Sequence, residues 1–496
     1  MRRPDADGGT SPYAFYGLGL LAVTNLLSYV TRNVIFAVFE PLKRDLHLAD
    51  AQLGWLASAY VLVFSLAALP AGILGDLRSR RGVIAGGVLL WSVSTLASGF
   101  VVTFAGLLLC RALVGAGAAA FGGPAQSLTA DYFPSRGRAV AMGVLASGIT
   151  LGGVLGIWLG GRLEADYGWR SALMVVSVPG FLLAALTSRL RDPLRNAPVS
   201  LRARLRELEM GLTALSRHFL PLILAIAIGG LLAWQFDRMY GADSSVDVAV
   251  FGAAVAVGLA LNIRLWVKAF ARAPEEGPRA MVRVFGAKAE SLAVVLRTPT
   301  LMYIFVGGAL ISFGTNGLVG WAPTFLAREL GLSVSEGAKL LGTWGLAAGI
   351  TGALVGGAVA DWLRRYTPTG RVITISAGLL VGGSLAIWLL TVRDLDLFVP
   401  VFCAAFFFLS WFNGPIAATI FDVVPARVSA TVAGAYLLFI HLAGDAVAFP
   451  LVGSLSDQFG LDRAVLLLPA VAMLGGVVVL GALRTVVGDM RKVALA

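Results

Sequence analysis

Long apolar stretches recur along almost the whole chain, and each is long enough to cross a lipid bilayer. A membrane-spanning helix needs about 20 largely apolar residues in a row, and fourteen windows of the sequence meet this requirement. They lie near residues 13–38, 50–74, 82–101, 104–131, 138–161, 169–188, 218–235, 246–268, 299–327, 339–361, 371–391, 396–421, 429–454 and 462–484. Only 14% of the residues are charged while 58% are hydrophobic, a composition that excludes a soluble protein of 496 residues. The sequence therefore predicts an all-α polytopic membrane protein with 14 spans.

Positive charge is concentrated in every second loop, which is typical of loops that face the cytoplasm. One set of loops carries Arg78, Arg80, Arg81 and the arginine-rich segment 189–217, whereas the intervening loops are mixed or acidic. This alternation predicts that both termini are cytoplasmic and that the protein lies in a cell membrane, either the inner or the plasma membrane. It also accounts for the net charge of +11, so nucleic acid is not expected as a partner.

Three charged motifs of the first half of the chain recur in the second half at nearly one offset. GDLRSRR at 75–81 is echoed by ADWLRR at 360–365, DYFPSR at 131–136 by DVVPAR at 422–427, and GRLEADYG at 161–168 by GSLSDQFG at 453–460. Because each match has the same loop position, we predict two similar six-helix halves of parallel topology. The predicted divisions are a cytoplasmic tail at 1–12, a six-helix half at 13–189, a central insertion at 190–297 with two extra spans, a second half at 298–485 and a cytoplasmic tail at 486–496.

The central insertion has a character of its own. Ser200–Arg217 places leucines at helical spacing among arginines and glutamates, as in an amphipathic helix on a membrane surface. Basic residues there and in the similar stretch Ala271–Leu292 could touch anionic headgroups, so membrane lipids are expected partners. A solvated, positively charged linker explains the same residues equally well.

The loop between the second and third windows reads GILGDLRSRRG at Gly72–Gly82. An acid followed by three arginines is costly in hydrocarbon but stable at the cytoplasmic surface, and the glycines allow two helices to approach closely. This order resembles GxLaDrxGRR, the hallmark loop of the major facilitator superfamily of transporters, although Leu77 and Ser79 replace the usual Arg and Gly. The resemblance implies the major facilitator fold, here with two extra central helices, and alternating access by rocking of the two halves.

The resemblance also implies cytoplasmic latches, which are salt bridges that break in each transport cycle. Such pairs must be weak enough to open, which fits an interfacial position. The expected members are Asp76, Arg80, Arg81, Asp131 and Arg136 in the first half and Asp361, Arg364, Asp422 and Arg427 in the second.

Four stretches are similar to the spinster-like branch of this superfamily, whose members carry amphiphilic substrates such as lysophospholipids and sphingoid phosphates. They are SYVTRN at Ser28–Asn33, the fourth window at Cys110–Pro134, GWRSALMVVSVP at Gly168–Pro179 and HLAGDAVAFPLVGSLSDQFG at His441–Gly460. The similarity covers both six-helix halves and excludes residues 190–297.

Two departures from the branch pattern bear on the substrate. The first-helix aspartate of the branch falls on Thr31 and the fourth-helix glutamate on Ala118, while the neighbouring arginines are kept as Arg32 and Arg111. A guanidinium group does not release its proton near neutral pH, so we hypothesise that Arg32 and Arg111 bind an anionic headgroup or carboxylate. Alternatively, either arginine pairs with an acid elsewhere or lies at the rim of the membrane.

His441 and Asp445 are four residues apart and therefore share one face of a helix. An acid and an imidazole inside a span are candidates for substrate binding and for proton coupling, although a purely structural hydrogen-bonded pair is an equal alternative. Asn316, Trp411 and Asn413 are further polar candidates for the substrate site, which the facilitator fold would place near the bilayer midplane.

No motif suggests catalysis. The chain has no phosphate-binding loop, no HExxH and no paired-cysteine motif, so we expect no enzymatic activity, no cofactor and no metal site. The predicted function is secondary transport of a small organic solute, favoured to be an organic anion or an amphiphilic lysolipid, by a monomer. Two alternatives stay open: multidrug or hydrophobic-compound efflux by proton antiport, and a non-transporting membrane sensor with the same fold.

Overall fold

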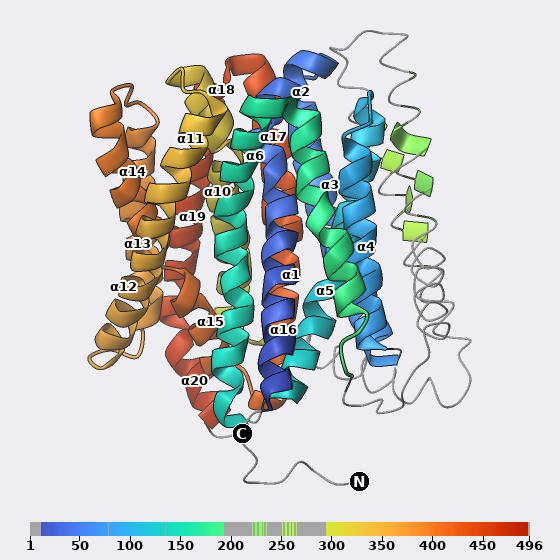
Figure 1. Cartoon of the computed structure of the whole chain (residues 1–496). Coiled ribbons are helices and arrows are strands. Elements are labelled where there is room, and N and C mark those ends of the chain that lie inside the picture. The colour runs from blue at the N-terminus through green and yellow to red at the C-terminus, as the bar shows by residue number, and fades with distance from the viewer. Residues whose placement is uncertain are drawn as a thin grey trace. The chain divides into compact units, whose positions relative to one another are not determined.

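A computed structural model describes residues 11–192 apart from Arg78 and Pro134, residues 294–494, and isolated residues between 221 and 264. Every regular element in these described parts is a helix (Figure 1). The chain forms two compact units, which are described separately: Met1–Leu46 with Leu62–Gly258, and His47–Val61 with Leu259–Ala496. The predicted division into two six-helix halves and a central insertion stays a prediction, because the first unit extends to Gly258 and the start of the second predicted span clusters with the second unit.

The first unit contains α1 (Pro12–Ala37), α2 (Phe39–Leu46), most of α3 (Asp50–Leu77), α4 (Arg80–Ser98), α5 (Phe104–Tyr132) and α6 (Ser135–Thr187). The α6 helix is interrupted at Gly168, whose φ of 80° lies in the left-handed region that glycine tolerates. The predicted windows 138–161 and 169–188 fall on either side of this residue. Glycines on α6 bring it close to α1, since a Cβ at Gly156 would lie only 2.7 Å from the Val30 carbonyl oxygen.

The second unit contains the other helices. They are α10 (Pro299–Glu329), α11 (Val334–Leu340), η1 (Leu341–Gly345), α12 (Leu346–Arg364), α13 (Gly370–Leu389), α14 (Leu395–Leu409), α15 (Asn413–Asp422), α16 (Ala426–Ile440), η2 (His441–Asp445), α17 (Ala446–Phe459), α18 (Leu461–Ala464), α19 (Leu467–Leu480), η3 (Gly481–Arg484) and α20 (Val486–Ala494). Its core is aliphatic, with Leu301, Ile304, Ile311 and Leu379 all fully buried. Two of these elements, η1 and η2, are single π-helical turns, which are rare and frequently mark functional sites.

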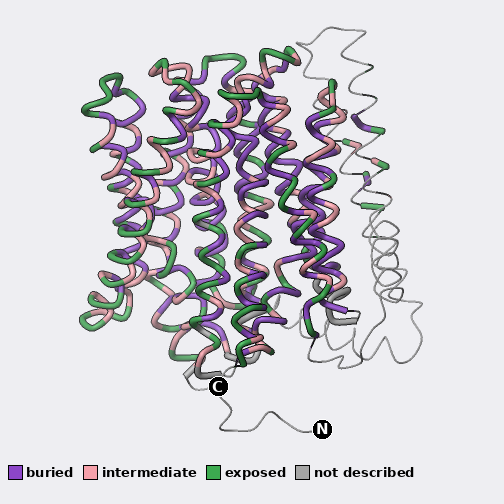
Figure 2. Tube along the Cα trace, viewed as in Figure 1, coloured by how far each residue is buried: buried purple, intermediate pink, exposed green. Residues whose placement is uncertain are grey.

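Eleven helices of the described residues are long and apolar enough to cross a membrane, with α6 counted as one despite its break at Gly168. Large apolar side chains such as Leu354 and Leu437 are exposed, and exposed positions recur along the helices (Figure 2). The two central predicted spans, 218–235 and 246–268, lie largely outside the described residues. The count of fourteen spans therefore stays a prediction.

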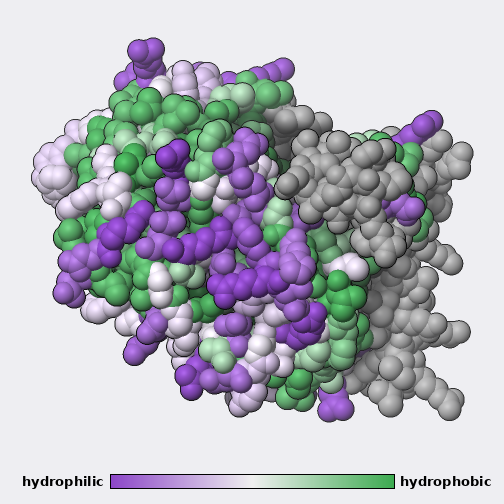
Figure 3. All heavy atoms as spheres, turned by 90° about the horizontal axis from the view of Figure 1, so that it is seen from above, coloured by the Kyte–Doolittle hydropathy of each residue, from purple (hydrophilic) through white to green (hydrophobic). Residues whose placement is uncertain are grey.

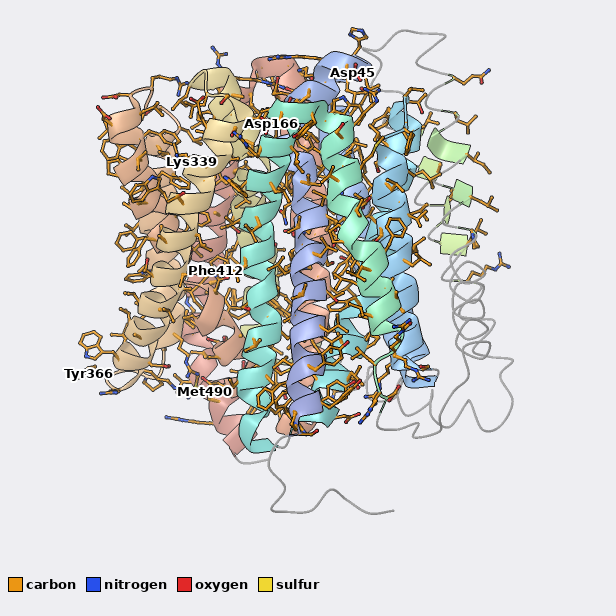
Figure 4. The ribbon with its side chains drawn as sticks, viewed as in Figure 1. Asp45, Asp166, Lys339, Tyr366, Phe412 and Met490 are labelled. Atoms are coloured by element: carbon orange, nitrogen blue, oxygen red, sulfur yellow. The ribbon has the colours of Figure 1, made fainter. Side chains whose placement is uncertain are left out.

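Labelled residues mark the two ends of the helices within each unit (Figure 4). In the first unit, Asp45 in the last turn of α2 and Asp166 near the break of α6 lie at the same end (Figure 4). In the second unit, Tyr366 in the α12–α13 loop and Met490 in α20 lie at one end, and both belong to segments predicted to be cytoplasmic.

The carboxylate of Asp489 fastens the short terminal helix α20 to the start of α10. Its side chain is 4% exposed and accepts hydrogen bonds from Thr300 N at 3.1 Å, from Thr300 Oγ1 at 2.8 Å and from Lys492 Nζ at 2.9 Å. Burial works against the charged form, but the hydrogen bonds from Lys492 and Thr300 outweigh it and lower the pKa of Asp489 below its ordinary value of 3.8.

This contact predicts a pH-dependent contribution to stability. Because the pKa is depressed in the folded state, Asp489 stabilises the fold above its ordinary value of 3.8, and the contribution disappears as the pH falls through the lower folded value. Thermal unfolding in detergent should show Asp489→Asn less stable than the wild type at neutral pH, with the gap closing below pH 3.8. A gap that is the same at both pH values would contradict the ionised contact.

Candidate functional site

Two arginines of the predicted anion site lie together on α1 and α5 of the first unit. Arg111 is 3% exposed, and its guanidinium donates to the backbone carbonyl oxygens of Thr31 at 3.2 Å and of Arg32 at 3.0 Å. Arg32 is half-buried, with its Cζ 5.6 Å from the centre of the Tyr29 ring. Arg111 is thus anchored to α1, and Arg32 is the more accessible of the two.

Thr31 and Ala118, which stand where the spinster-like branch has an aspartate and a glutamate, offer no titratable group. Thr31 is 1% exposed, and its hydroxyl donates back to the carbonyl oxygens of Leu27 and Ser28 on its own helix. Ala118 is 4% exposed. Thr31 and Ala118 therefore contribute no charge at this place on α1 and α5.

The geometry of Arg111 predicts that it stabilises the first unit. A hydrogen bond from a charged group contributes about 1.5–3 kcal/mol, so Arg111→Ala should lower the free energy of unfolding by about 3 kcal/mol through the two lost bonds to α1. Thermal or denaturant unfolding of the purified protein would measure the loss, with Arg111→Lys as an intermediate case. An alanine variant as stable as the wild type would show that these bonds do not hold α1.

The second group of predicted residues surrounds one buried carboxylate in the second unit. Asp445 is fully buried at the end of the π-helical turn η2, and its Oδ2 lies 2.7 Å from His441 Nδ1. Its Oδ1 accepts hydrogen bonds from the hydroxyl of Ser312 and from Asn316 Nδ2, the latter at 3.0 Å, both on α10. The structure thus brings together three predicted residues, Asn316, His441 and Asp445, and adds Ser312.

Close packing of η2 against α10 makes this arrangement possible. A Cβ at Gly444 would lie only 2.5 Å from the Ala309 carbonyl oxygen, so a larger residue would push η2 away from Ser312 and Asn316. The His441 side chain is 22% exposed while that of Asp445 is fully buried. The imidazole of His441 is therefore the more accessible of the two groups.

Trp411 and Asn413 lie apart from the Asp445 cluster, at the break between α14 and α15. Asn413 is exposed and donates from Nδ2 to the Ser410 carbonyl oxygen at 3.1 Å. Trp411 is half-buried in contact with the rings of Phe407 and Phe408, and its buried indole N–H has no hydrogen-bond partner among the described residues. Their expected part in substrate binding stays a prediction.

The predicted latch of the first unit centres on Arg80 at the start of α4. Its guanidinium contacts Asp131 at 2.6 Å and Asp192 at 2.7 Å, and Arg81 donates to the Leu190 carbonyl oxygen at 3.3 Å. Asp192, which lies just after α6, was not expected in this group. The side chains of Asp76 and Arg136 lie outside the described parts of the structure.

The latch of the second unit centres on a residue that the sequence reasoning passed over. Arg371 contacts both Asp422 and, at 3.2 Å, Asp361, while the expected Arg364 lies 3.0 Å from Asp422. The spacing between Arg80 and Arg371 equals that between Asp131 and Asp422, so the internal repeat contained the signal for Arg371. The side chain of the predicted Arg427 is not among those described.

Comparison with known proteins adds independent findings. The model of the Major Facilitator Superfamily matches residues 21–444. An MFS-type efflux pump of Mycolicibacterium smegmatis is 24% identical over 478 residues, which cover 94% of this chain and 91% of that protein. The sphingosine-1-phosphate transporter SPNS2 of Xenopus tropicalis is 32% identical over 171 residues, 34% of this chain and 33% of that one.

Solved structures show the same fold. The crystal structure of a bacterial homolog of the human lysosomal transporter Spinster, in an inward-facing and unoccupied conformation, aligns with a TM-score of 0.72 at 21% identity. The alignment covers 97% of this chain and 99% of that chain.

Proposed function

Because the chain belongs to the Major Facilitator Superfamily and is a multi-pass membrane transporter of small molecules, we propose that its solute is an organic anion, with a lysolipid-like amphiphile favoured. The observation that supports this proposal is the pair of guanidinium groups on α1 and α5, where Arg111 contacts the backbone of Arg32. Arginine is suited to phosphate and carboxylate because its planar donors match them bidentately. The similarity to a sphingosine-1-phosphate transporter points to the same class of solute.

The Asp445 cluster supports proton coupling as the energy source. Asp445 is buried in contact with His441, Ser312 and Asn316, and an acid beside an imidazole within a span is a pairing suited to proton transfer. In this proposal His441 and Asp445 link proton movement to the conformational cycle. The protein works as a monomer in the inner or plasma membrane, with both termini in the cytoplasm.

The second candidate function is efflux of hydrophobic compounds. A buried intramembrane acid is what a carrier of hydrophobic cations needs, and Asp445 provides one. An efflux pump is also among the similar proteins.

Uptake into liposomes separates the two functions. Purified protein would be reconstituted and supplied with labelled lysophospholipid, a panel of small organic anions and a hydrophobic cation, with protein-free liposomes as the control. The proposal expects saturable uptake of at least one anion and none of the cation. Uptake of the cation alone would favour efflux, and no uptake of any compound would favour the sensor alternative.

A further inference from the structure

The segment Leu190–Asp192, just after α6, is fastened to the start of α4 by contacts that the sequence analysis did not identify. Asp192 accepts a hydrogen bond from the backbone N–H of Arg80 at 3.2 Å and pairs with the Arg80 guanidinium at 2.7 Å. The carbonyl oxygen of Leu190 accepts a hydrogen bond from Arg81 Nη1 at 3.3 Å. The first two residues of α4 therefore hold both ends of this short segment.

Two tyrosines hold the residue in the middle of the segment. The backbone N–H of Arg191 donates to the Tyr13 hydroxyl at 2.6 Å, and the Tyr132 hydroxyl donates to the Arg191 carbonyl oxygen at 2.5 Å. The guanidinium of Arg191 lies over the Tyr13 ring, with Cζ 4.6 Å from the ring centre. The start of α1 and the end of α5 thus satisfy both backbone groups of Arg191.

These contacts lie at the end of the first unit where α1 begins. Hydrophilic side chains gather at the opposite end of the helices, where α2 lies (Figure 3), as expected where helices leave a membrane. The charge pattern predicts that the end with Leu190–Asp192 is the cytoplasmic one. The segment is therefore expected at the cytoplasmic boundary of the membrane, where the predicted central insertion begins.

The first extra span of the insertion, predicted at 218–235, also packs on the first unit. Every described residue from Pro221 to Gln235 is helical. Gly230 is buried, and a Cβ there would lie 3.0 Å from the Cβ of Ala105 at the start of α5, a close approach that glycine allows. Exposed apolar side chains recur at helical spacing on the other face, namely Leu224, Ile228 and Leu232. One face of this helix thus contacts α5, while the other is suited to lipid.

Burial distinguishes the two ion pairs that Arg80 makes. The side chains of Arg80 and Asp192 are 4% and 3% exposed, whereas that of Asp131 is 36% exposed. Separating a buried pair is strongly unfavourable because each charge is left without compensation, while an exposed pair contributes little. Of the two contacts of Arg80, the one with Asp192 is therefore the costlier to break.

We propose that the first extra span is a fixed part of the first unit, fastened there by Leu190–Asp192 and by the Gly230–Ala105 contact, and that it moves with this unit as one body during transport. The clustering of residues up to Gly258 with the first unit supports this proposal. The pair of Arg80 with Asp192 then stays closed throughout the cycle, and only the contact with Asp131 is available as a latch. This movement does not depend on which solute is carried.

A disulfide between α5 and the extra span tests the proposal. Ala105→Cys and Gly230→Cys would be introduced together with Cys110→Ala and Cys403→Ala, and the protein oxidised with copper phenanthroline in liposomes. The two Cβ positions lie close to the separation of about 3.5–4.5 Å that a disulfide requires, so the bond should form. Its closure is measured as lost labelling of the denatured protein by a polyethylene glycol maleimide. Uptake of the labelled anion or cation that the parent protein carries should be unchanged by closure, because both cysteines move together.

The matched control is Ala105→Cys with Leu232→Cys, which should form no disulfide because Leu232 is exposed on the other face of the helix. Uptake that stops when the Ala105–Gly230 bond closes, and returns on reduction, would overturn the proposal. So would a folded, transporting double-cysteine protein in which this bond does not form.

Hydrogen exchange tests the fastening of Leu190–Asp192 without any solute. Tyr13→Phe removes the acceptor of the Arg191 N–H, so amide exchange in a peptide that covers the segment should be about two- to tenfold faster, as expected for the loss of one hydrogen bond. Tyr16→Phe changes an exposed tyrosine of the same helix and should leave exchange unchanged. Equal exchange in the wild type and both variants would overturn the fastening and with it the proposal. This measurement decides the matter even if the cysteine pair does not fold, and it is independent of the anion proposal.

Discussion

Asp445→Asn is expected to abolish pH-driven uptake of the transported anion while leaving a folded protein. The carboxylate is fully buried and accepts from Ser312, Asn316 and His441, so the amide cannot reproduce its charge or all of its acceptor positions. Losing even one hydrogen bond to a charged group costs about 1.5–3 kcal/mol, which corresponds to a loss of rate of roughly tenfold to a hundredfold. Uptake would be measured in liposomes with and without an imposed pH gradient.

The control for Asp445→Asn is Asp396→Asn, which changes an exposed acid at the start of α14. That variant should transport like the wild type. His441→Gln should retain uptake down the solute's own gradient but lose its response to the pH gradient, because an amide cannot take up a second proton. An Asp445→Asn variant with the full wild-type response to pH would show that the cluster is only structural.

Arg32→Gln is expected to lower anion uptake about tenfold or more, because it removes charge-assisted, bidentate hydrogen bonds to the solute. Arg32 is the more accessible arginine of the pair, while Arg111 is engaged with the α1 backbone. The loss should appear as a raised KM, since the interaction is one of binding. Initial rates over a range of solute concentrations would measure it.

Two further variants show whether the effect of Arg32→Gln on uptake is specific to this arginine. Arg32→Lys keeps the charge without the planar donors and should recover part of the affinity. Arg191→Gln, just after α6 and beside Tyr13, changes another exposed arginine and should leave KM unchanged. Unaltered uptake by Arg32→Gln would remove Arg32 from the solute site.

Much of the fold follows from patterns local to the sequence. The apolar windows predicted the spans, and the break between the fifth and sixth windows falls at Gly168, where only glycine is relaxed at a φ of 80°. Arg80 and Asp131 were both expected among the latch residues, because both belong to motifs of the resemblance, but their pairing was not predicted. His441 and Asp445 were placed together by helical spacing alone.

Other parts of the site depend on contacts between distant residues. Asp50, Arg328 and Asp457 meet across separations of up to 407 residues, and no single stretch of sequence reveals that Asp457 caps α3. Ser312 reaches Asp445 from α10 where Gly444 lets η2 approach closely, and η2 is a π-helical turn, a local geometry that a 3.6-residue period does not predict. The sequence analysis missed Arg371 for another reason. It matched Arg80 to Arg364 through the short motif that begins at Asp361, and it did not apply the spacing between Asp131 and Asp422 to Arg80.

The most direct test of proton-coupled anion transport is a recording of internal pH while solute enters. Liposomes containing the purified protein and a pH-sensitive dye would receive the anion that shows uptake. The account predicts a solute-dependent change of internal pH in the wild type, absent in Asp445→Asn and strongly reduced in Arg32→Gln. Anion uptake with no accompanying proton movement, and no response to an imposed gradient, would contradict it.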